Sequence, residues 1–263
     1  MSNSYAAIGD VHGRIDLLRE LVDKVRLNHL FDPCCPAGSR KRFVLLGDYI
    51  DRGPNSNEVI EWLIRHQAGL IILPGNHELM MAEALQPHHR RHSRSFFDAW
   101  VNNGGDSTIR AYLMRYGDIG SDMDSARLIA AGPDAVVGLI PTEHLEYLEY
   151  LAFDSPPYHL DEEHKLLFVH AAIRPHKPLL AHSREELLWS RDPLFLCPAD
   201  PGWKDGWRVV HGHTIDPSPT ILPHRVGLDT GAFWTDRLTC AVFEPEKTVS
   251  TVTTNRHSDR AND

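Results

Sequence analysis

The sequence predicts an α/β fold in which parallel strands alternate with helices. Short apolar runs rich in branched residues alternate with segments of helical periodicity through the first 85 residues. This order requires parallel strands joined by right-handed crossovers. Each of the first three strands also runs into a glycine and a polar side chain, at the sheet edge where α/β proteins bind ligands. The predicted strands are 5–8, 43–46 and 70–73, and the helices after them are 14–29, 55–66 and 78–85.

The region from about 86 to 135 has a different pattern, which predicts a helical insertion or cap. Its apolar residues favour three short helices, at 95–101, 107–116 and 124–131, with an Asn-Asn-Gly-Gly break between the first two. Near its start lie three histidines that could bind a metal, although a solvated loop is the preferred interpretation: His88, His89 and His92.

The second half adds an amphipathic helix and further strands, and we expect one domain over residues 1–254. The helix is predicted at 142–151, buried strands at 166–169, 208–210 and 225–228, and late antiparallel strands at 238–244 and 248–253. The polar tail, 255–263, is expected to be disordered.

Composition excludes several classes of protein. The 263 residues carry a net charge of −9, which argues against nucleic-acid or anionic-membrane binding. No apolar run approaches the roughly 18 residues of a membrane span, and the first residues lack a signal-peptide pattern. The four cysteines form no Cys-x-x-Cys motif, so we expect a reducing, cytoplasmic compartment.

The side chains at the strand ends combine carboxylates, an amide and imidazoles. Such a set suits a borderline divalent metal, manganese first, with iron or zinc as alternatives. One carboxylate can bridge two cations about 3.5–4 Å apart, and Asp48 on the central strand is the natural bridge. We expect one ion to be completed by Asp10 and His12, and the other by Asn76, His170 and His213.

Two such cations would lower the pKa of a shared water, and the hydroxide formed could attack a phosphate ester. Arg52 and Arg191 are candidates to bind the phosphate, although Arg191 could instead form an ordinary ion pair with Asp192. His77 could protonate the leaving oxygen, with Asp51 holding its imidazolium form.

Other polar and aromatic residues near these positions are given structural roles. Glu78 is expected to cap or pair locally, because it lies at the start of a helix, where negative charge is favoured. His211 fits a buried, hydrogen-bonded histidine. Three tryptophans are interpreted as core or rim packing: Trp189, Trp203 and Trp207.

Three sequence blocks resemble the phosphoprotein phosphatase family of calcineurin-like metallophosphoesterases. They are Gly9–Gly13, Gly47–Gly53 and Gly75–Glu78. Later segments resemble its bacterial and phage lambda phosphatase-like branch: His170-Ala171, Trp189–Arg191, Gly212–Thr214 and Asp229–Ala232. The resemblance implies a four-layer α/β/β/α sandwich with a dinuclear metal site. It also implies the metal-ligand roles given above, the phosphate-binding roles of Arg52 and Arg191, and the proton-donor pair of His77 and Asp51.

The leading functional hypothesis is a metal-dependent phosphatase of phosphoserine and phosphothreonine proteins, with phosphotyrosine as a further substrate class. The alternative is a hydrolase of dinucleoside polyphosphates such as diadenosine tetraphosphate. Symmetrical hydrolases of that substrate have Ala-Arg-Gly and Asn-His-Asp, where this chain has Asp51–Gly53 and Asn76–Glu78, so both differences favour a phosphatase. A non-catalytic binding module on this scaffold would lack one of the metal-ligating residues, and none of them is missing from the sequence. No regulatory subunit is inferred, because the Ser-Ala-Pro-Asn-Tyr loop of the eukaryotic enzymes is absent from the sequence.

Overall fold

The structure is a computed structural model that describes residues 3–36, 38–86, 93–117, 124–196, 206–245 and 247–254. The histidines at 88, 89 and 92, Trp203 and the tail 255–263 lie outside these ranges, so the expectations for them stay predictions.

The first sheet contains the three strands predicted in the first 85 residues. Its order is β10-β9-β1-β2-β3, with β1, β2 and β3 parallel and β9 and β10 antiparallel, as predicted for the late strands. The strands are β1 (Ser4–Ile8), β2 (Lys41–Leu45), β3 (Leu70–Ile72), β9 (Thr239–Phe243) and β10 (Ser250–Thr253).

The second sheet has the order β4-β5-β6-β8-β7, in which β5, β6 and β8 are parallel. The strands are β4 (Tyr158–Asp161), β5 (Leu166–Val169), β6 (Arg208–His211), β7 (Thr220–Ile221) and β8 (Arg225–Gly227). The two antiparallel edge strands, β4 and β7, are not among the strands predicted from the sequence. They have only four and two residues, too few to show a periodic pattern.

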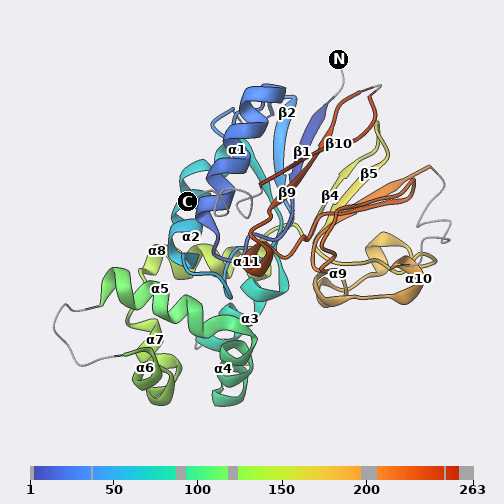
Figure 1. Ribbon diagram of the computed structural model, residues 1–263. Helices are drawn as coiled ribbons and strands as arrows, with labels where there is room; N and C mark the ends of the chain where they lie inside the picture. The colour runs from blue at the N-terminus through green and yellow to red at the C-terminus, as the bar shows by residue number, and fades with distance from the viewer. Residues whose placement is uncertain are drawn as a thin grey trace.

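The two sheets face each other, and helices cover the outer face of each (Figure 1). The alternation of side chains along β1 shows this, because Tyr5 and Ala7 pack between the sheets while Ala6 and Ile8 pack toward the helices. The outer layers are α1 (Ile15–His29) and α2 (Ser56–His66) on the first sheet, and α9 (Arg184–Trp189) and α10 (Pro193–Leu196) on the second. The predicted four-layer α/β/β/α sandwich is therefore confirmed.

A run of helices lies in the sequence between β3 of the first sheet and β4 of the second. In Figure 1 these helices are at the lower end of the molecule. The elements are α3 (Asn76–Leu85), α4 (Arg94–Trp100), a π-helical turn (Val101–Gly105), α5 (Asp106–Tyr116), α6 (Ser125–Ala131), α7 (Pro133–Val137), α8 (Thr142–Glu149) and a second π-helical turn (Tyr150–Asp154). At the predicted break, Gly104 has a φ of 109° and its carbonyl accepts a hydrogen bond from the amide of Arg52 (3.1 Å). This turn therefore connects the helical segment to the loop after β2.

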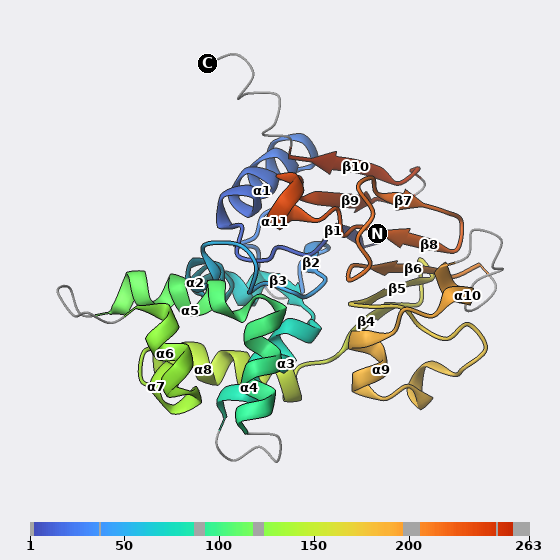
Figure 2. The ribbon, with the colours of Figure 1, turned by 60° about the horizontal axis from the view of Figure 1, so that its bottom comes forward.

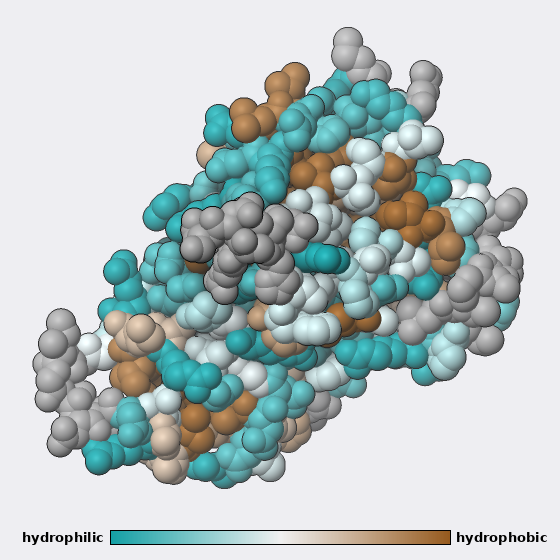
Figure 3. Space-filling model, in the orientation of Figure 1, coloured by the Kyte–Doolittle hydropathy of each residue, from teal (hydrophilic) through white to brown (hydrophobic). Residues whose placement is uncertain are grey.

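Short elements complete the fold: α11 (Ala232–Thr235) and the 3₁₀ turns Gln67–Gly69 and Leu179–Ala181. Figure 2 shows α11 beside α1 at the edge of the first sheet. No helix among the described residues is both long and apolar enough to cross a bilayer. On the face seen in Figure 3, hydrophobic residues form separate patches among hydrophilic ones.

Tyr5 links the two sheets, which suggests a test of the sandwich. Its buried hydroxyl donates to the Asp161 carboxylate on β4 (2.6 Å), and burial together with that bond raises the pKa of Tyr5, so the phenol stays protonated. We expect Tyr5→Phe to lower the free energy of unfolding by about 1–2 kcal/mol, measured by urea titration at neutral pH. As a control, Tyr158→Phe removes a hydroxyl for which the described residues show no hydrogen bond, and its effect should stay below about 0.5 kcal/mol. Equal losses in the two variants would contradict the assigned link.

Candidate active site

The predicted metal ligands lie at the carboxyl ends of the parallel strands of both sheets. Asp10 and His12 follow β1, Asp48 follows β2, Asn76 begins α3 after β3, His170 follows β5, and His213 follows β6. All six side chains are buried. The structure therefore brings together at one place residues that are as far apart as 203 positions in the chain.

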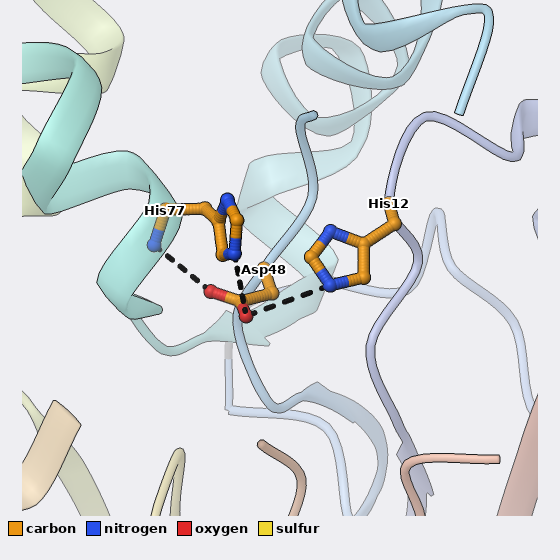
Figure 4. Close-up of side chains that lie close together, drawn as sticks. All are labelled: His12, Asp48 and His77. Carbon is orange, nitrogen blue, oxygen red and sulfur yellow. Dashed lines mark hydrogen bonds and ion pairs between the residues drawn. The ribbon is translucent and has the colours of Figure 1, made fainter. Parts of the chain in front are cut away.

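Asp48 lies between two groups of possible metal ligands. Its Oδ2 is 3.7 Å from Nε2 of His12 and 3.9 Å from Nε2 of His77 (Figure 4). Its Oδ1 is 3.4 Å from Nε2 of His170. The potential ligand atoms of His12, Asp48 and His77 lie within 4.8 Å of one another, and so do those of Asp48, His170 and His213. A carboxylate shared by two groups is the geometry expected of a bridging ligand.

The other two predicted ligands adjoin the second group. The Oδ1 atom of Asn76 lies 3.0 Å from Nε2 of His170. Both carboxylate oxygens of Asp10 accept the backbone amide of His213, at 3.1 and 3.0 Å. Asp10 is not in either three-residue group; these bonds come from the backbone of His213 and not from its ring, and the charge interaction described next relates Asp10 to the shared carboxylate of Asp48.

Buried negative charge accumulates around Asp48. Burial, together with repulsion from Asp229 and Asp48, raises the pKa of Asp10 well above its ordinary value. Burial also raises the pKa of Asp229, whose side chain is 3% exposed. For Asp48 itself, burial alone would raise the pKa, but the facing histidines lower it well below the ordinary range. Bound cations would offset the electrostatic repulsion among these carboxylates.

Two histidines are held neutral, with a ring nitrogen able to bind a metal. Burial and the neighbouring His170 lower the pKa of His213 to about 2, and its buried Nε2 has no hydrogen-bond partner among the described residues. Burial and the neighbouring His77 lower the pKa of His12 to about 3. A buried ring nitrogen without a partner is unusual in a folded protein. The donor set therefore fits divalent metal ions.

The Arg52 guanidinium donates a hydrogen bond to the ring nitrogen Nε2 of His12. Its Nη1 lies 2.8 Å from His12 Nε2, and its guanidinium stacks 5.1 Å from the ring centroid of Phe233. Because one lone pair cannot accept a hydrogen bond and bind a metal at once, a cation on His12 would displace this contact. Arg52 would then be free to bind an anion beside that cation.

His77 is paired with Asp51, as predicted from the sequence. Its Nδ1 lies 2.7 Å from Asp51 Oδ2, while Trp100 and Thr108 donate to the same carboxylate. Burial alone would lower the pKa of His77, but Asp48 and Asp51 outweigh it and raise the pKa. A raised pKa suits a proton donor, whereas the position of Nε2 beside Asp48 and His12 also suits a metal ligand.

Glu78 has a wider role than the local cap expected from the sequence. It accepts the amide of Gly75, which is local, but it also accepts the amides of Asp48 (3.0 Å) and Tyr49 (2.8 Å) from the loop after β2. The side chain is fully buried, and burial together with repulsion from Asp48 raises its pKa to about 7. The sequence alone does not show this contact, because residues 48 and 78 come together only when β2 and β3 pair in the sheet.

Several site residues have backbone conformations that favour glycine. Of the eight non-glycine residues with positive φ in the described part of the chain, five are His12 (44°), Asp48 (53°), Asp51 (71°), Arg52 (66°) and His213 (61°). Residues held in this region cost about 1–3 kcal/mol each and are concentrated at functional sites. The clustering supports this edge of the sheets as the functional site.

The remaining predicted residues lie nearby or belong to the core. Arg191 is exposed and its Nη2 donates to the backbone carbonyl of His213 (3.3 Å). His211 is buried and hydrogen-bonded to the carbonyl of Gly212, as expected of a structural histidine. Trp207 is buried in the outer core of the second sheet. Trp189, in contrast, is 40% exposed.

A cavity of about 560 Å³ is linked to the metal-ligand cluster through Trp189, which lines the cavity and contacts His213. Trp189 and Ser190 line one wall, next to Arg191, and Asn103 lines the other, next to the turn that contacts Arg52. The Trp189 ring lies 6.3 Å from the ring of His213, edge to face. Phe96, 37% exposed, also lines this cavity. The cavity therefore presents aromatic surface and residues that neighbour Arg191 and the turn that contacts Arg52, although neither of these arginines lines it.

Comparison with known proteins identifies relatives over nearly the whole chain. The bis(5'-nucleosyl)-tetraphosphatase PrpE [asymmetrical] of Bacillus thuringiensis (strain Al Hakam) is 26% identical over 264 residues, covering 94% of this chain and 93% of that protein. At this identity the similarity does not by itself establish the substrate of this chain.

Solved structures share the fold at lower sequence identity. The crystal structure of a proposed diadenosine tetraphosphatase has a TM-score of 0.61 at 20% identity and covers 97% of this chain and 96% of its own. A protein serine/threonine phosphatase from Saccharomyces cerevisiae has a TM-score of 0.51 at 13% identity and covers 97% and 80%. These two structures support the fold alone.

The family itself is established by a match over most of the chain. The model of calcineurin-like phosphoesterases matches residues 4–231, a span that contains every candidate site residue discussed above. The resemblance of the three sequence blocks is thereby confirmed. The chain belongs to the calcineurin-like phosphoesterase family.

Proposed function

We propose that this phosphoesterase hydrolyses dinucleoside polyphosphates, with diadenosine tetraphosphate as the test substrate. The observation that supports it most is the 560 Å³ cavity beside the metal-ligand cluster, because its exposed aromatic side chains suit a nucleobase. The Bacillus tetraphosphatase aligns over 94% of this chain, which supports the same substrate class. This proposal reverses the order of the two hypotheses drawn from the sequence.

Phosphoprotein hydrolysis was favoured by two motif differences, and the structure gives both an explanation that does not depend on the substrate. Asp51 holds His77 by a 2.7 Å contact. Glu78 accepts backbone amides of the loop after β2. Neither side chain needs to touch the leaving group, so neither distinguishes a phosphoprotein from a dinucleotide.

The proposed reaction uses two divalent metal ions, manganese first, with iron or zinc as alternatives. One ion would be held by Asp10, His12 and Asp48, and the other by Asp48, Asn76, His170 and His213. When bound, such ions activate a water molecule and neutralise charge that develops on the phosphoryl group.

The remaining steps belong to side chains of the chain itself. Arg52 and Arg191 bind phosphoryl oxygens and orient the scissile bond, since a guanidinium matches phosphate geometry. His77 donates a proton from Nε2 to the leaving oxygen, and Asp51 keeps the ring oriented through Nδ1. Trp189 stacks on the base nearest the reacting phosphate.

We also propose a cytoplasmic location, as expected from the cysteine pattern. Cys34, Cys35 and Cys240 are free thiols, which a reducing compartment maintains.

The substrate class can be decided by direct competition. We expect the manganese-loaded protein to convert diadenosine tetraphosphate to AMP and ATP with a higher kcat/KM than it shows for a phosphoserine peptide, both followed by chromatography. Equal amounts of AMP and ATP would indicate the asymmetrical cleavage named for the Bacillus relative. Faster turnover of the phosphopeptide would restore the protein-phosphatase hypothesis.

His77→Asn separates the proton-donor role from a metal-ligand role. Loss of one acid group should lower kcat by about 10²–10⁴-fold, while metal content measured by mass spectrometry stays at the wild-type value. His66→Asn, at the end of α2, is the control and should change neither quantity. Loss of metal in His77→Asn would instead place His77 with His12 and Asp48 as a ligand.

Trp189→Ala tests base stacking. The KM for diadenosine tetraphosphate should rise roughly 5- to 100-fold, the range expected for one stacked base. Acetyl phosphate, which has no ring, should show an unchanged KM in the same variant. A similar rise for both substrates would mean that Trp189 supports the site structurally rather than binding the base.

A further inference from the structure

The helical segment between the sheets contacts the active site at Asp51. Two of its side chains reach that carboxylate: Trp100, the last residue of α4, and Thr108, in the first turn of α5. Both are fully buried, as Asp51 is. Figure 2 shows α4 beside α3 and α5 beside α2, the helices that follow β3 and β2. Neither residue belongs to a sequence segment that resembles the family.

Thr108 is bonded to Asp51 at both the backbone and the side chain. Its Oγ1 donates to Asp51 Oδ1 (2.6 Å) and accepts the Asp51 amide (3.0 Å). Ser56 Oγ lies 3.0 Å from the same amide and 2.9 Å from Thr108 Oγ1. Asp51 has a φ of 71°, which is an unfavourable conformation for a residue with a side chain. The bonds from Thr108 and Ser56 therefore stabilise Asp51 in this conformation.

Trp100 contacts the other side of the carboxylate. Its Nε1 donates to Asp51 Oδ2 (3.0 Å) and lies 3.2 Å from Oδ1. Gly105 packs against the indole, where an added Cβ atom would lie 2.5 Å from the ring. Nδ1 of His77 approaches the same Oδ2 at 2.7 Å. Because the donors reach both oxygens from different elements, all of these bonds form in one orientation of the carboxylate.

The orientation of Asp51 determines where His77 places Nε2, the atom assigned to donate the proton. A histidine ring held through one nitrogen presents the other nitrogen in one direction. This direction is toward the metal-ligand cluster, since Nε2 lies 3.9 Å from Oδ2 of Asp48. A displacement of about 1 Å at a reacting group can lower a rate about 10²-fold.

We propose that Thr108 and Trp100 are positioning residues for the proton donor, and that the helical segment contributes them to the site. They act through Asp51, which holds His77, and do not touch the substrate. The inference rests on the proton-donor role of His77 in the proposed function, but it does not depend on the identity of the substrate.

The leaving group separates positioning from a purely structural role. Phenyl phosphate needs a proton on its leaving oxygen, whereas dinitrophenyl phosphate releases an anion that is stable without one. In the manganese-loaded protein, we expect Thr108→Val to lower kcat for phenyl phosphate about 10- to 100-fold, the range typical of residues that orient a catalytic group. Its KM, its metal content and kcat for dinitrophenyl phosphate should stay at the wild-type values.

Further variants test the same contacts. Trp100→Phe removes the indole N–H and should show the same difference between the two esters, whereas Thr108→Ser keeps the hydroxyl and should restore kcat. Thr239→Val is the matched control, because its hydroxyl is equally buried but bonds only to other threonines, and it should show no difference between the esters. Deuterium exchange followed by NMR gives a readout besides activity, since the Asp51 amide should exchange about 10-fold faster in Thr108→Val than in the wild type.

Equal losses of kcat on the two esters in Thr108→Val and Trp100→Phe would make both residues merely structural and would overturn the inference. Unchanged kcat in both variants, or unchanged exchange of the Asp51 amide in Thr108→Val, would also overturn it. His77→Asn is measured alongside. A difference between the esters in His77→Asn alone would refute the positioning role and leave the proposed function intact. Equal losses in His77→Asn would instead contradict the proton-donor role itself, and the inference with it.

Discussion

The buried carboxylate of Glu78 fixes the loop on which the whole site depends. It accepts backbone amides from Gly75, at the start of α3, and from Asp48 and Tyr49, after β2. These bonds join two strand ends across the parallel sheet. Because Asp48 is the carboxylate shared by both groups of possible metal ligands, its orientation is set by a side chain that need not touch substrate.

Backbone hydrogen bonds then hold the strained loops against each other. The carbonyl of Asp48 accepts the amides of Val11 and His12, and the carbonyl of Tyr49 accepts the amide of Gly13. Asp48 and His12 both have positive φ, an arrangement that would relax if these bonds were lost. The energy of the strained conformations is offset by these bonds and by the surrounding core. The candidate ligands are therefore positioned by the chain's own hydrogen bonds and core.

Sequence reasoning succeeded where local pattern and parallel topology suffice. Asp10, Asp48 and Asn76 were placed together because strands that alternate with helices must bring their carboxyl ends to one edge. It could not find the bond from Glu78 to Asp48, which depends on register, or the charge that Asp229 adds beside Asp10. It also assigned His77 the proton-donor role alone, because spacing does not show that Nε2 lies beside Asp48 and His12. The edge strands β4 and β7 were too short to show a period.

The proposed function separates the chemistry, at the metal-ligand cluster, from substrate recognition, at the 560 Å³ cavity, which explains why the motifs could not decide the substrate. The metal-ligand cluster lies on loops after the parallel strands, and each of its residues belongs to one of the sequence segments that resemble the family. The 560 Å³ cavity is instead lined by Asn103 in the helical segment, and of the residues named here only Trp189 on α9 belongs to a segment that resembles the family. Phe96 completes its aromatic surface from α4, which no motif covers. In the proposed function these walls select the molecule that reaches the metal-ligand cluster, so a shared cluster is compatible with different substrates.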